Sequence, residues 1–221
     1  MPATQRPSPE RTHAGGFAEM TEPTEKTHRL FVACELPEDV RHTVGGLVES
    51  LREQSDGAVR WVNPSNLHVT LKFLGEVPER QIPAVKMALQ EAVVRHSAFF
   101  LELANIGTFG GREGLRVMWA AVAGDVLRLE ALARDVNRAL SVVGFERETR
   151  PFRPHLTLGR VRNEVGTRQR AELEVAVGKI EIPECEWRTT EISLVRSRLH
   201  PDGARHDTVA TFPLRAPPPQ G

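Results

Sequence analysis

Apolar and polar residues alternate along this chain in patterns typical of short strands and amphipathic helices. Between Leu67 and Gly75, apolar side chains occupy every second position, as expected for a strand with one buried face. Elsewhere, apolar runs, helix-start prolines and stop glycines complete the prediction. Strands are expected over residues 29–35, 67–75, 99–106, 115–122, 155–161, 191–198 and 209–214, helices over 37–54, 78–96, 125–143 and 167–177, and a glycine-rich loop between 106 and 115.

The order strand, helix, strand, helix, strand occurs twice, which indicates a duplication. A shift of 87 residues aligns nine identical residues without gaps in a 43-residue window, more than chance predicts at this composition. The pairs are Arg29/Arg116, Ala33/Ala120, Arg41/Arg128, Gly57/Gly144, Arg60/Arg147, Pro64/Pro151, His68/His155, Thr70/Thr157 and Leu71/Leu158. Two unrelated halves of similar composition are the alternative, and a duplicated lobe explains the identities better.

The two ends of the chain differ in composition from its middle. Residues 1–27 are rich in Pro, Thr, Glu and Gly and lack the apolar segment of a signal peptide, so we expect a disordered extension with Met20 as a second candidate start. Residues 28–215 are expected to form one bilobal domain, and residues 216–221 a flexible tail. No apolar run is long enough to cross a membrane, and we expect a cytoplasmic protein.

The charge balance limits the partners of the chain. Its 29 basic and 29 acidic residues give a formal net charge of zero, which argues against a protein that coats long nucleic acid by counterion release. An enzyme that binds one terminal phosphate remains compatible with this balance. The two cysteines, Cys34 and Cys185, are not spaced for a disulfide framework or a zinc site, and Cys34 lies in an apolar run expected in the core.

The most specific sequence feature is the tetrapeptide His-x-Thr-Leu, which occurs at residues 68–71 and again at 155–158. In a strand, residues i and i+2 point to the same face, so His68 and Thr70 should project together, as should His155 and Thr157. Two related lobes packed about a pseudo-twofold axis would direct both pairs into one cleft. A neutral and a protonated imidazole there could remove one proton and supply another, which is the apparatus for phosphodiester cleavage.

Other chemistries fit these residues less well. A metal site needs three or four ligands, and no Asp, Glu or Cys lies two or four residues after either histidine of the motifs. Neither strand carries a glycine-rich nucleotide-binding signature. We therefore expect no metal and no cofactor. His42, His96, His200 and His206 are interpreted as surface or structural histidines.

The two motifs, in NLHVTLKFLGEV (residues 66–77) and RPHLTLGRVR (residues 153–162), resemble those of the 2H phosphoesterase superfamily, and the chain is most similar to its RNA 2′,3′-cyclic phosphodiesterases, also called 2′-5′ RNA ligases. The segments RLFVACELP, VRWVNPSNLHVTLKFLGEV and LVRSRL fit that family as well, so the resemblance covers residues 29–215. It implies an α+β fold, bilobal and duplicated, with two antiparallel sheets flanked by helices around a central V-shaped cleft. It also implies a reaction without a required metal.

The resemblance further implies the roles of the site residues. The family opens a terminal 2′,3′-cyclic phosphate to a 2′-phosphate, and some members catalyse the reverse 2′-5′ joining reaction. His68 would be the proton donor to the departing 3′ oxygen, and His155 the proton acceptor that activates water. Thr70 and Thr157 would hold the phosphoryl oxygens.

Three further residues are expected to bind substrate. By resemblance Arg160 is a third phosphate contact, although strand alternation alone directs it away from His155 unless a bulge at Gly159 turns it back. Phe73, at the equivalent place in the first motif, and Phe109, in the glycine-rich loop, are candidates to stack on the terminal base. Core packing is equally compatible with Phe73, and Gly110 replaces a proline that often follows the position of Phe109 in the family. Near the C-terminus, His206 stands where members of the family often carry an aromatic residue.

The expected partners are RNA ends that carry a 2′,3′-cyclic phosphate, tRNA fragments among them. The protein is expected to be a monomer and to have no membrane partner. Two alternatives stay open. The same chemistry could act on another cyclic phosphate or a 2′-5′ oligonucleotide, or the protein could be a non-catalytic binder of terminal phosphates. The binder has no need of a proton donor and a proton acceptor together, so the intact motifs favour an enzyme.

Overall fold

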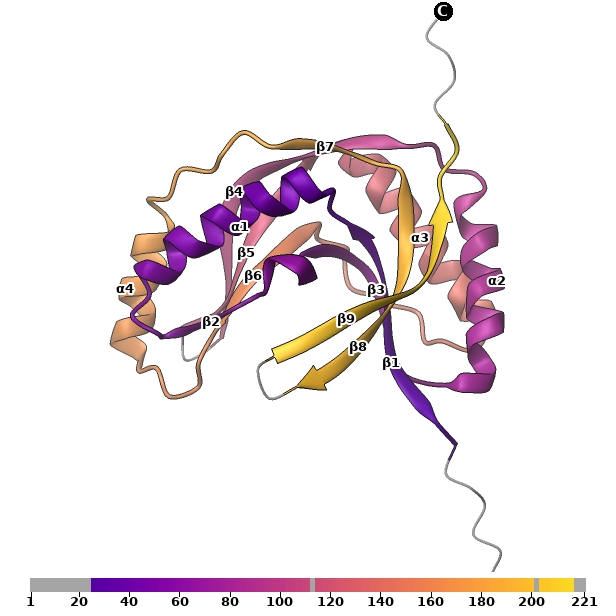
Figure 1. Cartoon of the computed structure of the whole chain (residues 1–221), viewed down its shortest axis with the longest axis horizontal. Helices are drawn as coiled ribbons and strands as arrows, with labels where there is room; N and C mark the ends of the chain where they lie inside the picture. The colour runs from indigo at the N-terminus through magenta and orange to yellow at the C-terminus, as the bar shows by residue number, and fades with distance from the viewer. Residues whose placement is uncertain (1–24, 112–113, 201–202, 217–221) are drawn as a thin grey trace, which may run out of the picture.

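The computed structural model describes residues 25–111, 114–200 and 203–216 of the chain (Figure 1). Of the predicted tails at residues 1–27 and 216–221, residues 1–24 and 217–221 lie outside these ranges, and Thr27 is already the first residue of a strand. Four α-helices and nine strands follow one another along the described residues. The strands are β1 (Thr27–Glu35), β2 (Val59–Trp61), β3 (His68–Pro78), β4 (Phe99–Gly111), β5 (Gly114–Gly124), β6 (His155–Val161), β7 (Glu186–Thr189), β8 (Glu191–His200) and β9 (Gly203–Pro213), and the helices are α1 (Glu38–Glu53), α2 (Ile82–Val93), α3 (Val126–Val142) and α4 (Thr167–Val177).

The strands form one curled sheet in the order β7-β4-β5-β6-β3-β1-β8-β9, with β2 paired to β6. The order is symmetric about its middle: β6, β5 and β4 on one side correspond to β3, β1 and β8 on the other. All pairings between these strands are antiparallel. This confirms the α+β class and the duplication. The structure differs from the expectation of two separate sheets, because one residue pair, Val69 with Leu156, joins the two halves at β3 and β6.

The two repeats exchange elements. The third strand of each repeat pairs with the first strand of the other, since β4 lies beside β5 and β8 lies beside β1. The helices also cross over: α1 and α4 cover the half that contains β4, β5 and β6, and α2 and α3 cover the half that contains β3, β8 and β9 (Figure 1). All four helices lie on one face of the curled sheet. We call the opposite face the open face.

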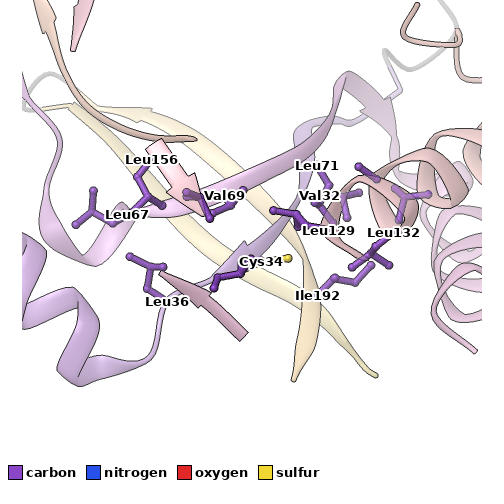
Figure 2. Close-up of a cluster of buried hydrophobic side chains, with 14 of the residues drawn as sticks. Val32, Cys34, Leu36, Leu67, Val69, Leu71, Leu129, Leu132, Leu156 and Ile192 are labelled. Carbon is purple, nitrogen blue, oxygen red and sulfur yellow. The ribbon is translucent and has the colours of Figure 1, made fainter. Parts of the chain in front are cut away.

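A continuous apolar core lies between the helices and the sheet. Val32 and Cys34 of β1, Val69 and Leu71 of β3, and Leu156 of β6 point into it, as Figure 2 shows. Cys34 is a buried core residue, as expected. No helix among the described residues is long and apolar enough to cross a bilayer.

Three sequence expectations need correction. The glycine-rich segment between 106 and 115 is not a loop, because β4 continues to Gly111 and β5 begins at Gly114, so that Gly107 and Gly110 lie within a hairpin. The short strands β2 and β7 were not predicted, since three or four residues carry too little periodicity. Strand pairing relates the first strands of the repeats by 86 residues rather than 87, so two of the nine identities, at Arg29 and Ala33, are fortuitous.

Candidate active site at the junction of the two halves

The two His-x-Thr-Leu motifs begin the strands that join the halves of the sheet. Val69 and Leu156, the residues after the two histidines, pair with each other and are fully buried in the core. Alternation along a strand therefore places His68 and Thr70, as well as His155 and Thr157, on the open face, where all four are half-buried. Since the strands run antiparallel, the two pairs flank the junction from opposite ends. This confirms the faces predicted from the sequence.

Each motif histidine is oriented by a backbone carbonyl two residues before it. Nδ1 of His68 lies 2.6 Å from the carbonyl oxygen of Asn66, and Nδ1 of His155 lies 2.7 Å from that of Arg153. A carbonyl oxygen only accepts hydrogen bonds, so Nδ1 carries the proton in both rings. Nε2 is consequently the atom of each imidazole that is free to accept or donate a proton on the open face.

A β-bulge lies at the last residue of each motif. In β3, Thr70 and Lys72 pair with consecutive residues of β1, and in β6, Thr157 and Gly159 pair with consecutive residues of β5, so Leu71 and Leu158 are the extra residues. An extra residue reverses the alternation of faces that follows it. The burial pattern agrees, because Lys72 and Gly159 are buried, whereas the residues after them are exposed.

The second bulge places Arg160 on the open face with the motif residues. Gly159 is required there, because a Cβ atom at this position would lie 2.7 Å from Val59 Cγ1 and 2.8 Å from Trp61 Cε3. In the first motif the corresponding residue is Phe73, whose surface is 70% exposed. The structure thus brings both predicted binding residues, Phe73 and Arg160, to the face that carries the motifs.

His68 lies in a more apolar and more crowded environment than the sequence indicated. Its ring centroid is 4.6 Å from that of Phe31 and 5.3 Å from that of His206. Burial lowers the pKa of His68 to about 4, with a smaller effect of His206 in the same direction. The hydrogen bond to the Asn66 carbonyl and the charge of Glu35 oppose this shift and raise the pKa. In the free protein, His68 is therefore a neutral imidazole at pH 7.

Aromatic rings surround His155 on its open side. Phe109 stacks on Trp119 with a centroid distance of 4.9 Å and forms a T-shaped pair with His155 at a centroid distance of 5.4 Å. Trp119 also lies 6.1 Å from His155 and extends over Gly107, where a Cβ atom would come within 2.2 Å of the indole. The predicted residue Phe109 therefore lies beside the site, although its stacking partner in this structure is Trp119.

Sequence reasoning missed four contributors to the site: Phe31, Glu35, Trp119 and His206. His206 is expected from the sequence to be a surface or structural histidine, yet β9 carries it to the ring of His68. Its position at a place usually aromatic in the family was a usable signal. Glu35 pairs with His68 across β1 and β3 and accepts a hydrogen bond of 3.0 Å from the Thr208 hydroxyl, a contact between segments 173 residues apart. Within residues 25–111, 114–200 and 203–216, no three His, Cys, Asp or Glu side chains converge into a possible metal site.

By its fold and its site, the chain belongs to a class of duplicated α+β proteins that carry one histidine motif in each repeat. Both motifs lie on the open face. The sequence profile of the 2′-5′ RNA ligase superfamily matches residues 36–201, and the chain belongs to this superfamily. This confirms the resemblance based on the motifs.

Individual relatives match most of this chain over nearly their own full length. The RNA 2′,3′-cyclic phosphodiesterase of Methanothermobacter thermautotrophicus is 32% identical over 187 residues, which are 84% of this chain and 98% of that protein. The protein of the same name from Archaeoglobus fulgidus is 32% identical over 187 residues, which are 83% of this chain and 99% of that protein. Among solved structures, apo LigT of E. coli has a TM-score of 0.67 and 26% identity and covers 87% of this chain and 99% of its own. LigT has also been solved with phosphate and with 3′-AMP.

Proposed function

We propose that this protein is a phosphodiesterase that opens RNA 2′,3′-cyclic phosphate ends to 2′-phosphomonoesters by two-histidine acid–base catalysis. The observation that carries the proposal is the pair of imidazoles at the β3–β6 junction, each with Nδ1 held by a carbonyl and Nε2 free. Acid–base catalysis of this kind needs two such atoms on one open face. The names of the relatives support the substrate.

The proposed reaction is a single in-line displacement. His155 Nε2 takes a proton from water as the water oxygen forms its bond to phosphorus. The bond between phosphorus and the ribose 3′ oxygen breaks, and His68 Nε2 gives its proton to that oxygen. The product keeps the phosphate on the 2′ oxygen. His68 ends neutral and His155 protonated, and exchange with solvent restores both.

The proton donor must be charged before it acts, whereas His68 is neutral in the free protein at pH 7. A bound phosphate supplies the missing stabilisation, because a nearby anion raises the pKa of an imidazole. Glu35 acts in the same direction. We infer that substrate binding raises the pKa of His68 enough for this histidine to take up a proton. The protonation state that is competent for catalysis therefore exists only in the complex with substrate.

The remaining residues bind and orient the substrate in this proposal. The Thr70 and Thr157 hydroxyls donate to the phosphoryl oxygens, and Arg160 offers a charge-assisted contact from the bulge after the second motif. Phe73, exposed at the equivalent bulge, is the ring best placed to stack on the terminal base. Phe109, paired with Trp119, contributes a second aromatic surface on the other half.

The direct test is turnover of an oligonucleotide that ends in a 2′,3′-cyclic phosphate, with chelator present. We expect full activity in chelator, and a loss of at least ~100-fold in kcat for both His68→Asn and His155→Asn, the usual scale for a general acid or base. The double variant should lose little more than either single one, because the two groups act as a unit. Near-normal kcat in either single variant would contradict the assignment, and binding without turnover would favour the terminal-phosphate binder.

The identity of the product shows which ester bond of the cyclic phosphate is broken. Phosphorus NMR should show a 2′-phosphate that resists a phosphatase specific for 3′-phosphates. A 3′-phosphate would exchange the roles of His68 and His155. Incubation of 5′-hydroxyl and cyclic-phosphate ends at high concentration tests the 2′-5′ joining reaction. In this reaction the 5′ hydroxyl takes the place of water, so His155 removes its proton and His68 again protonates the departing 3′ oxygen.

A further inference from the structure

Two arginines lie side by side on the open face, two residues beyond the end of the second motif. Arg60 of β2 pairs directly with Arg160 of β6, and both are exposed. Their neighbours Val59 and Trp61 pack over Gly159 from the helix-covered face, so alternation turns Arg60 to the open face. Side chains paired in this way have Cβ atoms ~5 Å apart.

The pairing of Arg60 with Arg160 destabilises the free protein. Like charges directly opposite each other on adjacent strands destabilise a sheet. In the part of the chain that the structure describes, neither Arg60 nor Arg160 has an ion pair or a side-chain hydrogen bond, and Val117, on the other side of Arg160, is apolar. Other arginines of the same sheet are neutralised, as Arg196 and Arg198 are by Asp207. An anion between the two guanidinium groups would remove the repulsion.

We propose that Arg60 binds the phosphodiester that precedes the terminal nucleotide, so that the site is built for oligonucleotides rather than for single cyclic nucleotides. This inference rests on the proposed function, which places the cyclic phosphate between His68 and His155. Arg160 lies about two strand steps from Thr157, ~7 Å along β6, and Arg60 lies one strand further out. A strand of RNA that enters over β2 therefore presents its next phosphate to Arg60.

The experiment compares two dinucleotides that end in a 2′,3′-cyclic phosphate, one with a natural phosphodiester and one with a neutral methylphosphonate linkage. The wild-type protein should favour the charged linkage in kcat/KM by about 10- to 100-fold, the scale of one hydrogen bond to a charged group. Arg60→Gln should abolish the preference, and Arg60→Lys should restore part of it. Arg134→Gln, which removes an exposed arginine on α3, should keep the preference intact.

Two further measurements separate binding from folding and from catalysis. The melting temperature of Arg60→Gln should equal or exceed that of the wild type, because the substitution relieves repulsion, so lost preference cannot result from unfolding. Calorimetric binding of the 2′-phosphate product dinucleotides should show the same preference for the charged linkage.

The possible results separate the inference about Arg60 from the proposed function. A wild-type protein that treats both linkages alike, or an Arg60→Gln variant that keeps the preference, overturns the inference while hydrolysis stands. A preference in product binding without any turnover would support Arg60 and overturn the proposed function.

Discussion

At the scale of single residues, one motif is placed in two different environments. His68 lies against Phe31 and His206 with Glu35 nearby, whereas His155 lies against the stacked pair Phe109 and Trp119. Burial lowers the pKa of His68 most strongly, and Glu35 opposes it. The difference between the two environments provides a physical basis for a division into proton donor and proton acceptor.

Glu35→Gln tests this division without a change in size. The substitution removes a negative charge that stabilises the imidazolium, so the pKa of His68 should fall further. If His68 is the proton donor, it must be protonated in the complex, and the high-pH limb of the kcat profile should move to lower pH. We expect a loss of about three- to tenfold in kcat at pH 8, corresponding to a pKa change of ~0.5 to 1, and a smaller loss at pH 6.

The control is Glu91→Gln, an exposed acid on α2, which should leave the profile in place. A shift of the low-pH limb instead would identify His68 as the base, because a base must lose its proton to act. The two limbs of the pH profile report the titration of His68 and His155 as a coupled pair and not of either residue alone. The same measurement in His155→Asn therefore completes the assignment of proton donor and proton acceptor.

At the scale of elements, the two bulges determine which side chains accompany the motifs. Without an extra residue at Leu71 and Leu158, Phe73 and Arg160 would point into the core. The residues after the two extra leucines, Lys72 and Gly159, are both buried on the helix-covered face. Lys72 reaches across it to donate to Asn137 Oδ1 at 2.7 Å and to the Glu146 carbonyl at 2.6 Å, which ties β3 to the segment before the second motif.

Gly159→Ala tests the second bulge. Its Cβ would meet Val59 and Trp61 closer than van der Waals contact allows, so β2 must move away from β6. We expect destabilisation of about 1–3 kcal/mol, as for overpacking in a core, with a larger relative loss of substrate affinity because both Arg60 and Arg160 are displaced. Denaturant unfolding and KM measure the two effects.

The matched control is Gly46→Ala on α1, where a Cβ meets no atom within 4 Å. Alanine in an exposed helix position should leave activity intact and raise stability by about 0.5–1 kcal/mol. A Gly159→Ala variant as stable and active as the Gly46→Ala variant would contradict the role assigned to the bulge.

At the scale of the whole molecule, neither repeat is a self-contained unit. Each half of the sheet takes its third strand from the other repeat, and each repeat sends one helix across to the other half. The site lies where the halves meet at Val69 and Leu156. The duplication therefore produces one interlocked domain in which both histidines depend on both repeats.

Division of the chain between residues 112 and 113 tests this dependence. The fragment 1–112 keeps β1, β3 and β4 but lacks β5 and β8, the partners of β4 and β1. We expect each fragment alone to show no cooperative thermal unfolding by circular dichroism, and the mixture to regain cooperative unfolding and activity. Cooperative melting of one fragment alone near the temperature of the intact protein would show that the repeats fold separately.

Local sequence determined most elements and the chemistry they carry. Alternation at residues 67–75 and 155–161 placed both histidines and both threonines on one face, because the two-residue period of a strand is a local property. The recurrence of the motif indicated the duplication, and the family followed from it. The four helices were likewise predicted close to their observed bounds, since their apolar spacing and end signals lie within each segment.

Tertiary structure alone decided which distant segments complete the site. The exchange of β4 and β8, the bulges after the motifs and the pairing of Arg60 with Arg160 depend on registers between strands, which no local pattern specifies. For the same reason, Glu35 and His206 became neighbours of His68 only when β1 and β9 were placed beside it. Their effect on its pKa is a property of burial and proximity, and these exist only in the folded chain.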